Sequence, residues 1–162
     1  MRATFALLAF AALPAPTPSR APQRGSALDF AVVVNATVPV DDLTLDEVRR
    51  IFTLGRRFWQ AGRPVLVLLP GEGLPGRRVL LDQVCHLSDA QHRRLILERL
   101  YQGEIDAPPK FAGTERETVA FVGATPGMIG IVTAGGPLDA EVKVLRIDGK
   151  KPGDPGYPLR RQ

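Results

Sequence analysis

Two short apolar runs in the first half of the chain have almost no polar interruption. They extend from Phe30 to Asn35 and from Val65 to Leu69. Runs of this kind are typical of strands that are buried on both faces of a sheet. Two later segments, Met128 to Val132 and Val142 to Ile147, are also apolar and short. We therefore predict four strands at these positions.

Helical patterns alternate with these strands, and three of the helix starts have the same signature. Thr44 is followed by Glu47, Ser88 by Gln91 and Thr114 by Glu117, which are the spacings of a capping box. The inward stripe of the first predicted helix consists of Leu45, Val48, Ile51 and Phe52, and Gly55 ends it. A further helix carries Val79, Leu80 and Val84. Strands that alternate with helices predict an α/β fold with a mostly parallel sheet flanked by helices.

The two ends of the chain differ from its middle in composition. Arg2 and the apolar run from Ala3 to Leu13 have the pattern of a secretory signal and are too short to span a bilayer. We interpret residues 1–27 as a signal peptide and flexible lead-in, residues 28–149 as one domain, and residues 150–162 as a polar tail rich in Pro and Gly. The chain is thus expected to be periplasmic or secreted, with no membrane span after the signal is removed.

Charge and reactive residues exclude several classes of function. The net charge is +4, and the arginines are scattered as pairs, so we expect no nucleic-acid partner. Cys85 is the single cysteine and is interpreted as a small buried hydrophobe. His86 and His92 have no further ligands at a metal spacing, and surface or loop roles are expected for them. No pattern of catalytic residues is present, so we predict no enzyme, no metal and no cofactor.

Trp59 and the arginines around it allow two readings. The aromatic pair Phe58-Trp59 forms either a ligand platform or a loop anchor packed on the first helix, and we favour the anchor. Arg56, Arg57 and Arg63 form either a solvated rim or a surface that attracts an anionic partner, and the rim is the default.

Taken in order, the segments of this chain resemble the substrate-binding proteins of phosphate ABC transporters. The matching segments are Leu43 to Phe52, the Trp59 loop, Val65 to Leu69, the Thr-Pro-Gly turn and strand from Thr125 to Val132, Val142 to Gly149, and Tyr157-Pro158-Leu159. The resemblance covers roughly residues 30–160. It implies one lobe, with hinge strands, of a type II periplasmic-binding-protein-like fold. It also implies a non-enzymatic protein that binds phosphate or a related oxyanion, with an ABC permease or another envelope protein as partner.

The chain departs from this family at the anion site. In the family, an arginine after the second strand and a Ser-Gly-Thr helix start hold the anion. Here Leu69 stands roughly where the arginine is expected, the hydroxyl groups are missing, and Glu72 adds a negative charge. The remaining candidate ligand residues are Gly73, Leu74, Gly76, Arg77, Arg78, Thr125 and Gly127.

This departure leaves an alternative function open. The chain is either a phosphate-type solute-binding domain or a periplasmic interaction or sensor module that kept the fold and lost the anion site. A single lobe cannot close on a ligand as a hinged pair does, so a homodimer through the open face is a corollary. We expect the double substitution Leu69→Arg and Leu74→Ser to create or improve phosphate affinity.

Overall fold

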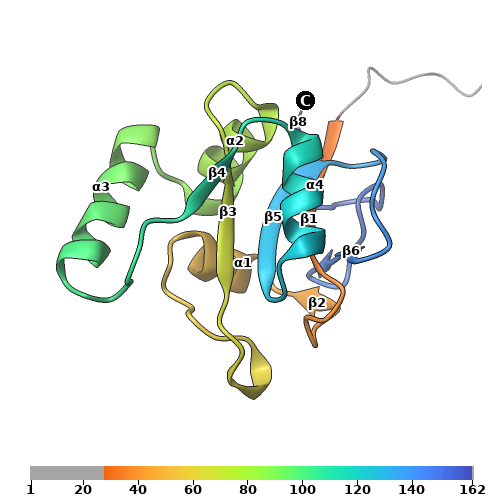
Figure 1. Cartoon of the computed structure of the whole chain (residues 1–162). Coiled ribbons are helices and arrows are strands. Elements are labelled where there is room, and N and C mark those ends of the chain that lie inside the picture. The colour runs from red at the N-terminus through yellow and green to blue at the C-terminus, as the bar shows by residue number, and fades with distance from the viewer. Residues whose placement is uncertain (1–27, 162) are drawn as a thin grey trace, which may run out of the picture.

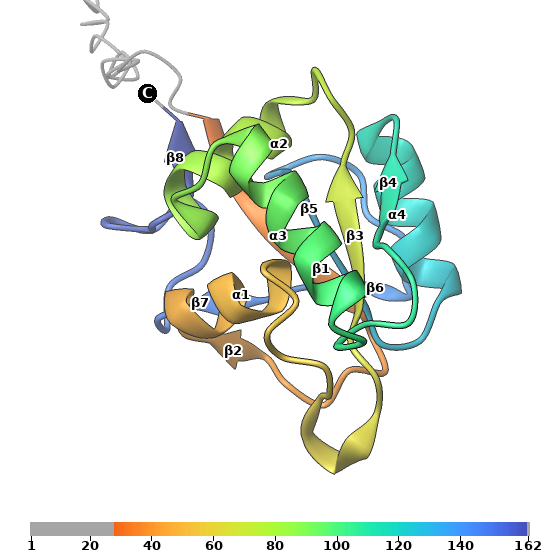
Figure 2. The same cartoon turned by 90° about the vertical axis from the view of Figure 1, so that its left-hand side faces the viewer.

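Residues 28–161 are described by the structure, a computed structural model, and they form a central sheet between two layers of helices (Figures 1 and 2). The signal peptide predicted within residues 1–27 lies outside the described residues. Within the described part of the chain, no helix is long and apolar enough to cross a membrane. In chain order the elements are β1 (Leu28–Asn35), β2 (Asp42–Leu43), α1 (Leu45–Phe52), η1 (Gln60–Gly62), β3 (Leu66–Pro70), α2 (Pro75–Val79), η2 (Leu80–Cys85), α3 (Asp89–Tyr101), β4 (Lys110–Ala112), α4 (Glu115–Ala124), β5 (Met128–Thr133), β6 (Val142–Val144), β7 (Arg146–Ile147) and β8 (Arg160–Arg161).

The main sheet has the strand order β4-β3-β5-β1-β6, and β8 pairs with the start of β1. Strand β3 is parallel to β4 and β5, whereas β1 is antiparallel to β5, β6 and β8. Strand β1 therefore runs against all other strands of this sheet. The predicted α/β class with flanking helices is confirmed, and the sheet is mixed where we expected it to be mostly parallel. A continuous apolar run indicates burial on both faces, but it carries no information about strand direction.

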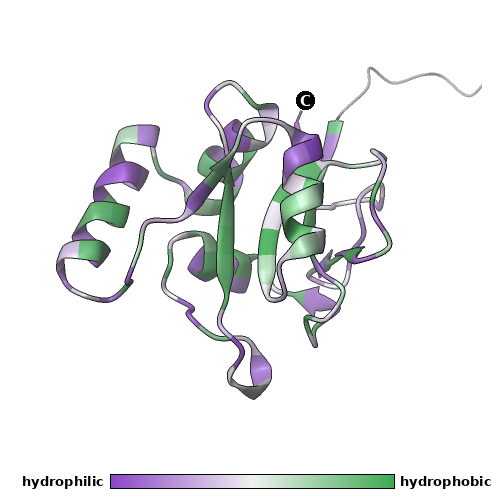
Figure 3. Ribbon diagram, viewed as in Figure 1, coloured by the Kyte–Doolittle hydropathy of each residue, from purple (hydrophilic) through white to green (hydrophobic). Residues whose placement is uncertain are grey.

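The two faces of β1 pack into two separate layers. Phe30, Val32 and Val34 point into the larger cluster, together with the buried side chains of α1, α2 and η2. Ala31 and Val33 point into the smaller cluster, which lies beneath α4. Figure 3 shows that the central strands are hydrophobic along most of their length. The helices α1, α2 and α3 thus cover one face of the sheet, and α4 covers the other.

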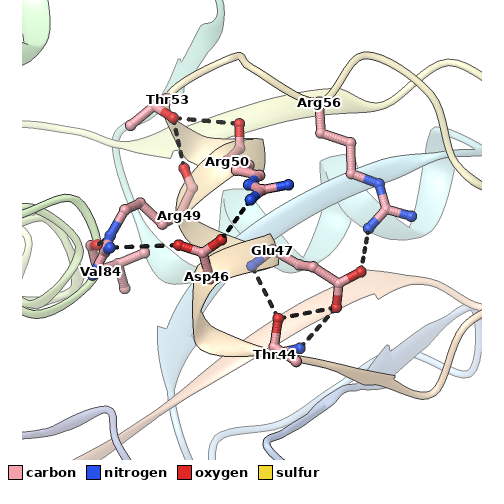
Figure 4. Close-up of polar contacts among 8 residues, drawn as sticks. All are labelled: Thr44, Asp46, Glu47, Arg49, Arg50, Thr53, Arg56 and Val84. Atoms are coloured by element: carbon pink, nitrogen blue, oxygen red, sulfur yellow. Dashed lines mark hydrogen bonds and ion pairs between the residues drawn. The ribbon is translucent and has the colours of Figure 1, made fainter.

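The capping boxes predicted at the starts of α1 and α3 are present. The hydroxyl of Thr44 accepts from the Glu47 amide at 3.2 Å, and the Glu47 carboxylate accepts from the Thr44 amide at 2.9 Å (Figure 4). The same carboxylate accepts from Arg56 at 3.0 Å. The hydrogen bond from the Thr44 backbone is the main cause of a lowered pKa at Glu47. Ser88 and Gln91 form the equivalent pair at α3.

The box predicted at α4 is only half formed. Thr114 accepts from the Glu117 amide at 3.1 Å, as expected. The Glu117 carboxylate accepts from the Gly113 amide at 2.7 Å instead of from the Thr114 amide. The carboxylate therefore still satisfies a donor just before the helix, one residue earlier than the sequence signature implies.

The C-terminal third of the chain has a divided strand and a last segment that folds back. The strand predicted from Val142 to Ile147 is divided at Leu145, so that β6 pairs with β1 while β7 pairs with β2 in a small parallel sheet. The polar segment after Lys150 packs on the domain. Tyr157 and Leu159 are buried in the larger cluster, and the Tyr157 hydroxyl donates to the Phe30 carbonyl at 2.8 Å.

Candidate functional site

The structure separates the candidate ligand residues into two groups at opposite ends of the sheet. Gly73, Leu74, Gly76, Arg77 and Arg78 follow the end of β3, in the loop before α2 and in α2 itself. The other two candidates, Thr125 and Gly127, precede the start of β5. Because β3 and β5 are parallel and begin side by side, the first group lies at the carboxyl edge of the sheet and the second at its amino edge.

The start of α2 has no side-chain cap. Leu74 occupies the N-cap position with an extended backbone, and its side chain makes no capping hydrogen bond. The helices α1, α3 and α4, in contrast, are capped by Thr44, Ser88 and Thr114. The Gly76 amide belongs to the first turn, where helical N–H groups have no partner within the helix. An uncapped helix start at the carboxyl edge of parallel strands is a place where an anion can accept hydrogen bonds.

Gly73 and Gly76 support this loop in different ways. Gly73 is exposed and has a φ of +88°, a backbone conformation that residues with a side chain rarely adopt. Gly76 is buried, and a Cβ added there would meet Ile131 and Phe30 of the sheet. The side-chain position of Gly76 is therefore turned towards the core, so its backbone amide is the group it could offer to a ligand.

Arg77 is engaged by the protein itself. Its Nε and Nη2 donate to Asp89 Oδ1 at 2.8 Å and 2.5 Å, and its Nη1 donates to the Pro70 carbonyl at 3.2 Å. The guanidinium also lies 5.3 Å from the centre of the Phe111 ring. The side chain is 6% exposed. A guanidinium with all of its nitrogens bonded and almost no exposure holds α2, β3 and α3 together, and an incoming anion would have to compete with Asp89 for it.

A chain of ion pairs continues from Asp89 to the exposed loop. Asp89 Oδ2 accepts from Arg93 Nη2 at 2.8 Å, and Arg93 Nη1 donates to Glu72 Oε1 at 2.9 Å. Arg78 is exposed and lies 3.7 Å from Asp82. These residues line a shallow pocket of about 360 Å³ beside the start of α2, in which three arginines face three carboxylates. The pocket therefore has no net charge.

At the same edge, two carboxylates from the first turn of α4, those of Glu115 and Glu117, accept hydrogen bonds from neighbouring residues. Glu115 Oε1 accepts from the Thr133 amide at 3.0 Å and from the Thr133 hydroxyl at 2.6 Å. The Glu117 carboxylate accepts from the Gly113 amide. Acidic side chains complement the positive end of the helix dipole. At the start of α2, in contrast, no carboxylate of the described residues accepts from the Gly76 amide.

Leu69 cannot take the role that the sequence comparison suggested for an arginine at this position. Its side chain is fully buried in the larger cluster, between β3 and the helices. An arginine there would place a charge in the apolar core instead of at the loop, at a large cost in stability. The burial of Leu69 therefore argues against the Leu69→Arg part of the double substitution, and Glu72, which lies in the loop, is the better position to change.

Thr125 and Gly127 belong to a structural joint at the amino edge. Gly127 has a φ of +85°, and its carbonyl accepts from Trp59 Nε1 at 2.8 Å and from the Leu66 amide at 3.1 Å. Trp59 is 3% exposed. The interpretation of Trp59 as a loop anchor is therefore confirmed, and its polar partner is the Thr-Pro-Gly turn. Thr125 lines a separate groove at this edge.

The histidines and the cysteine are not arranged as a reactive site. His92 is fully buried, with Nε2 3.1 Å from the Phe52 carbonyl, so the expected surface or loop role is wrong for this residue. His86 Nδ1 lies 2.8 Å from the Asp82 carbonyl. Burial raises the pKa of the Cys85 thiol to about 12, which keeps it protonated at neutral pH. Among residues 28–161, no group of three or more His, Cys, Asp or Glu side chains could hold a metal ion.

Sequence reasoning missed the residues that balance the charges of this edge. Asp89 was part of a predicted helix start, and Arg93 was one of several scattered arginine pairs. The spacing of Asp89 and Arg93 on α3 is a local signal for an ion pair. Nothing in the sequence indicates that both reach across to Arg77 and Glu72.

Comparison with known proteins supports the fold rather than the ligand. No protein-family model and no curated protein matches the sequence. Solved structures do match. A phosphate ABC transporter substrate-binding protein with bound phosphate from Clostridium perfringens superposes with a TM-score of 0.67 at 17% identity, over 83% of this chain and 53% of that chain. An ABC-type phosphate transport receptor from Vibrio cholerae gives 0.66 at 15% identity, over 84% and 55%.

The fold is that of the phosphate-binding proteins. PstS from Borrelia burgdorferi agrees, with a TM-score of 0.65 at 10% identity, over 83% of this chain and 55% of that chain. This chain therefore spans about half the length of the solved phosphate-binding proteins that it matches. It has a solute-binding fold, and its ligand has to be inferred from its own residues.

Proposed function

We propose that this protein is a solute-binding domain of the phosphate-transporter type, which binds phosphate or a related small oxyanion without catalysis. The uncapped start of α2, on a fold shared with phosphate-binding proteins, carries this proposal. The anion accepts from the backbone amides of Gly73 and Gly76, and Arg78 and Arg93 line the pocket that contains Gly73.

Binding requires that Glu72 moves aside. Its side chain is 75% exposed, so its ion pair with Arg93 contributes little and opens readily. The Arg77–Asp89 pair is far less exposed and stays in place. An anion held by few backbone donors and one released arginine binds weakly, and we expect a Kd of about 1 mM.

The test is thermal unfolding of the full chain with about 10 mM phosphate, against chloride at equal ionic strength. With a Kd of about 1 mM, phosphate should stabilise the folded state by about 1.4 kcal/mol. The variant Glu72→Gln removes the competing carboxylate and should increase the phosphate-dependent shift. The variant Leu74→Ser adds an N-cap hydroxyl whose oxygen accepts from the first-turn amides in place of the anion, so it should decrease the shift.

Glu98→Gln is the matched control, since Glu98 forms a comparable exposed pair with Arg94 on the outer side of α3. It should leave the phosphate-dependent shift unchanged. Equal melting temperatures in phosphate and chloride for the wild type and for both loop variants would contradict the proposal.

The same proposal extends to location and partners. We infer that the chain is exported through its N-terminal segment and that it delivers its ligand to an ABC permease or another envelope protein. A second copy of the chain is proposed to supply the contacts of a second lobe. Fusion of residues 1–27 to a reporter that is active only after export tests whether the chain is exported. The mass in solution, measured by light scattering, tests whether two copies associate.

A further inference from the structure

An apolar groove lies at the amino edge of the sheet, at the opposite end from the proposed anion site. Its volume is about 520 Å³, and it is formed by the segment after α1, the start of β3, the segment before β4 and the end of α4. Its floor includes Val67 and Met128, which are buried. The proposed function does not use this groove.

Three large apolar side chains in the groove are unusually exposed. Phe58 is 54% exposed, Leu66 39% and Phe121 43%. They come from three separate segments and line the same hollow. Single exposed apolar residues are normal on a protein surface, but several that gather in one place mark a site of interaction. Trp59, which is buried next to Phe58, already anchors this loop.

The charged side chains around the groove are mainly cationic. Lys110 has no carboxylate within 4.0 Å among residues 28–161, and the nearest one to Arg57 is Asp106 at 3.9 Å. Asp106 is 98% exposed, so it neutralises Arg57 poorly. Arg56 is paired with Glu47. The groove thus carries a surplus of positive charge, whereas the pocket beside α2 is balanced.

We propose that this groove docks a protein segment that inserts an aromatic or large aliphatic side chain and carries Asp or Glu residues beside it. The apolar walls accept the inserted side chain, which supplies most of the affinity. Lys110 and Arg57 pair with the flanking carboxylates, which orient the segment and speed its association. The occupant is thus an acidic partner protein or peptide.

The structure argues against the two other occupants. A second copy of this chain would have to bring free carboxylates to the groove, but the carboxylates next to the exposed Leu97 and Tyr101 on α3 are already paired with Arg94 and Arg99. A membrane surface would need apolar side chains that protrude into the lipid. Here they line a hollow, which suits an inserted side chain.

Fluorescence anisotropy with the full chain and a labelled peptide, Asp-Glu-Asp-Leu-Phe-Asp-Glu-Asp, tests the proposal. Two comparison peptides keep the length: one replaces Leu-Phe by Ala-Ala, and the other replaces every acidic residue by Lys. We expect saturable binding of the acidic Leu-Phe peptide, and binding at least roughly tenfold weaker for each comparison peptide.

Two variants of the protein probe the groove directly. Phe121→Gln removes an apolar wall, and Lys110→Glu reverses a charge at the rim. Each should weaken the binding of the acidic peptide roughly tenfold. The matched controls are Leu97→Gln, at an exposed leucine on α3, and Arg116→Glu, at the far end of α4. Both controls should bind as the wild type does. Far-ultraviolet circular dichroism checks that all four variants are folded.

Three results would overturn the proposal. One is the absence of saturable binding of the acidic Leu-Phe peptide. Another is equal binding by the groove variants and their controls. The third is binding to vesicles of phosphatidylglycerol and phosphatidylcholine that Phe121→Gln abolishes while the peptide does not bind, which would assign the groove to a membrane surface. None of these results depends on phosphate, so they are independent of the proposed function.

Discussion

Gly130 shows how a single residue sets the distance between α4 and the sheet. It lies in β5 opposite Val33 of β1, and a Cβ added there would be 2.7 Å from Thr118 Cγ2 and 3.4 Å from Val122 Cγ2. The absence of a side chain at this position therefore allows α4 to approach the sheet closely.

We predict that Gly130→Ala lowers the free energy of unfolding by roughly 1–3 kcal/mol, because the added methyl group forces α4 away from β5. Gly136→Ala is the control, since the nearest atom to its added Cβ is the Thr133 carbonyl oxygen at 3.6 Å. Urea denaturation measures both. Equal stability of the two variants would show that α4 moves without cost.

His92 makes stability depend on pH. Burial, the main cause, lowers its pKa below the ordinary 6.5, the nearby Arg77 lowers it further, and the Phe52 carbonyl and Asp89 act in the opposite direction. The unfolded chain therefore binds more protons than the folded chain as the pH falls below 6.5, and stability decreases there.

We expect His92→Gln to remove part of this decrease, because glutamine can still donate to the Phe52 carbonyl but does not titrate. The measurement is the free energy of unfolding at about pH 7.5 and about pH 5.5. His86→Gln, at an exposed histidine, should keep the slope of the wild type. If His92→Gln keeps that slope as well, another group is responsible for it.

At the scale of elements, the last residues of the chain are part of the core. Leu159 is fully buried, and β8 pairs with the start of β1. Arg160 holds Asp29 through two hydrogen bonds of 2.6 Å and 3.1 Å, which lower the pKa of that carboxyl. Asp29 therefore stabilises this junction at neutral pH, and the contribution is lost as the pH falls below the usual range of an aspartate.

We predict that Leu159→Ala costs roughly 2–5 kcal/mol, the range for a buried leucine that leaves a cavity. Leu138→Ala, at a leucine that is 39% exposed, should change the stability by less than about 1 kcal/mol. The comparison is made by melting temperature and urea denaturation. A small effect at Leu159 would mean that the segment after Lys150 is dispensable.

At the scale of the whole molecule, three central strands connect the two layers of helices. The two hydrophobic clusters share β1, β3 and β5, whose residues alternate between them. Neither layer of helices can therefore detach without exposing the same strands, and we expect one cooperative unfolding transition.

This expectation can be measured with two probes of different parts of the fold. The fluorescence of Trp59, the single tryptophan, reports on the joint at the amino edge, and far-ultraviolet circular dichroism reports on all helices. The two urea transitions should coincide. Separate midpoints would show that the amino edge, with its groove, unfolds on its own.

The sequence alone determined the local features. It predicted the starts of α1 and α3, because a capping box joins residues three positions apart and needs no distant partner. It also predicted the buried strands β1, β3 and β5, because their apolar runs are long enough to be covered on both faces.

Tertiary structure alone decided what depends on which segments meet. It set the reversed direction of β1, the burial of Leu69, the transfer of Thr125 and Gly127 to the amino edge, and the pairing of Arg77 with Asp89. It also placed Tyr157 against Phe30, 127 positions away in the sequence. Burial and ion pairing depend on neighbours brought together by the whole chain, and no local pattern specifies those neighbours.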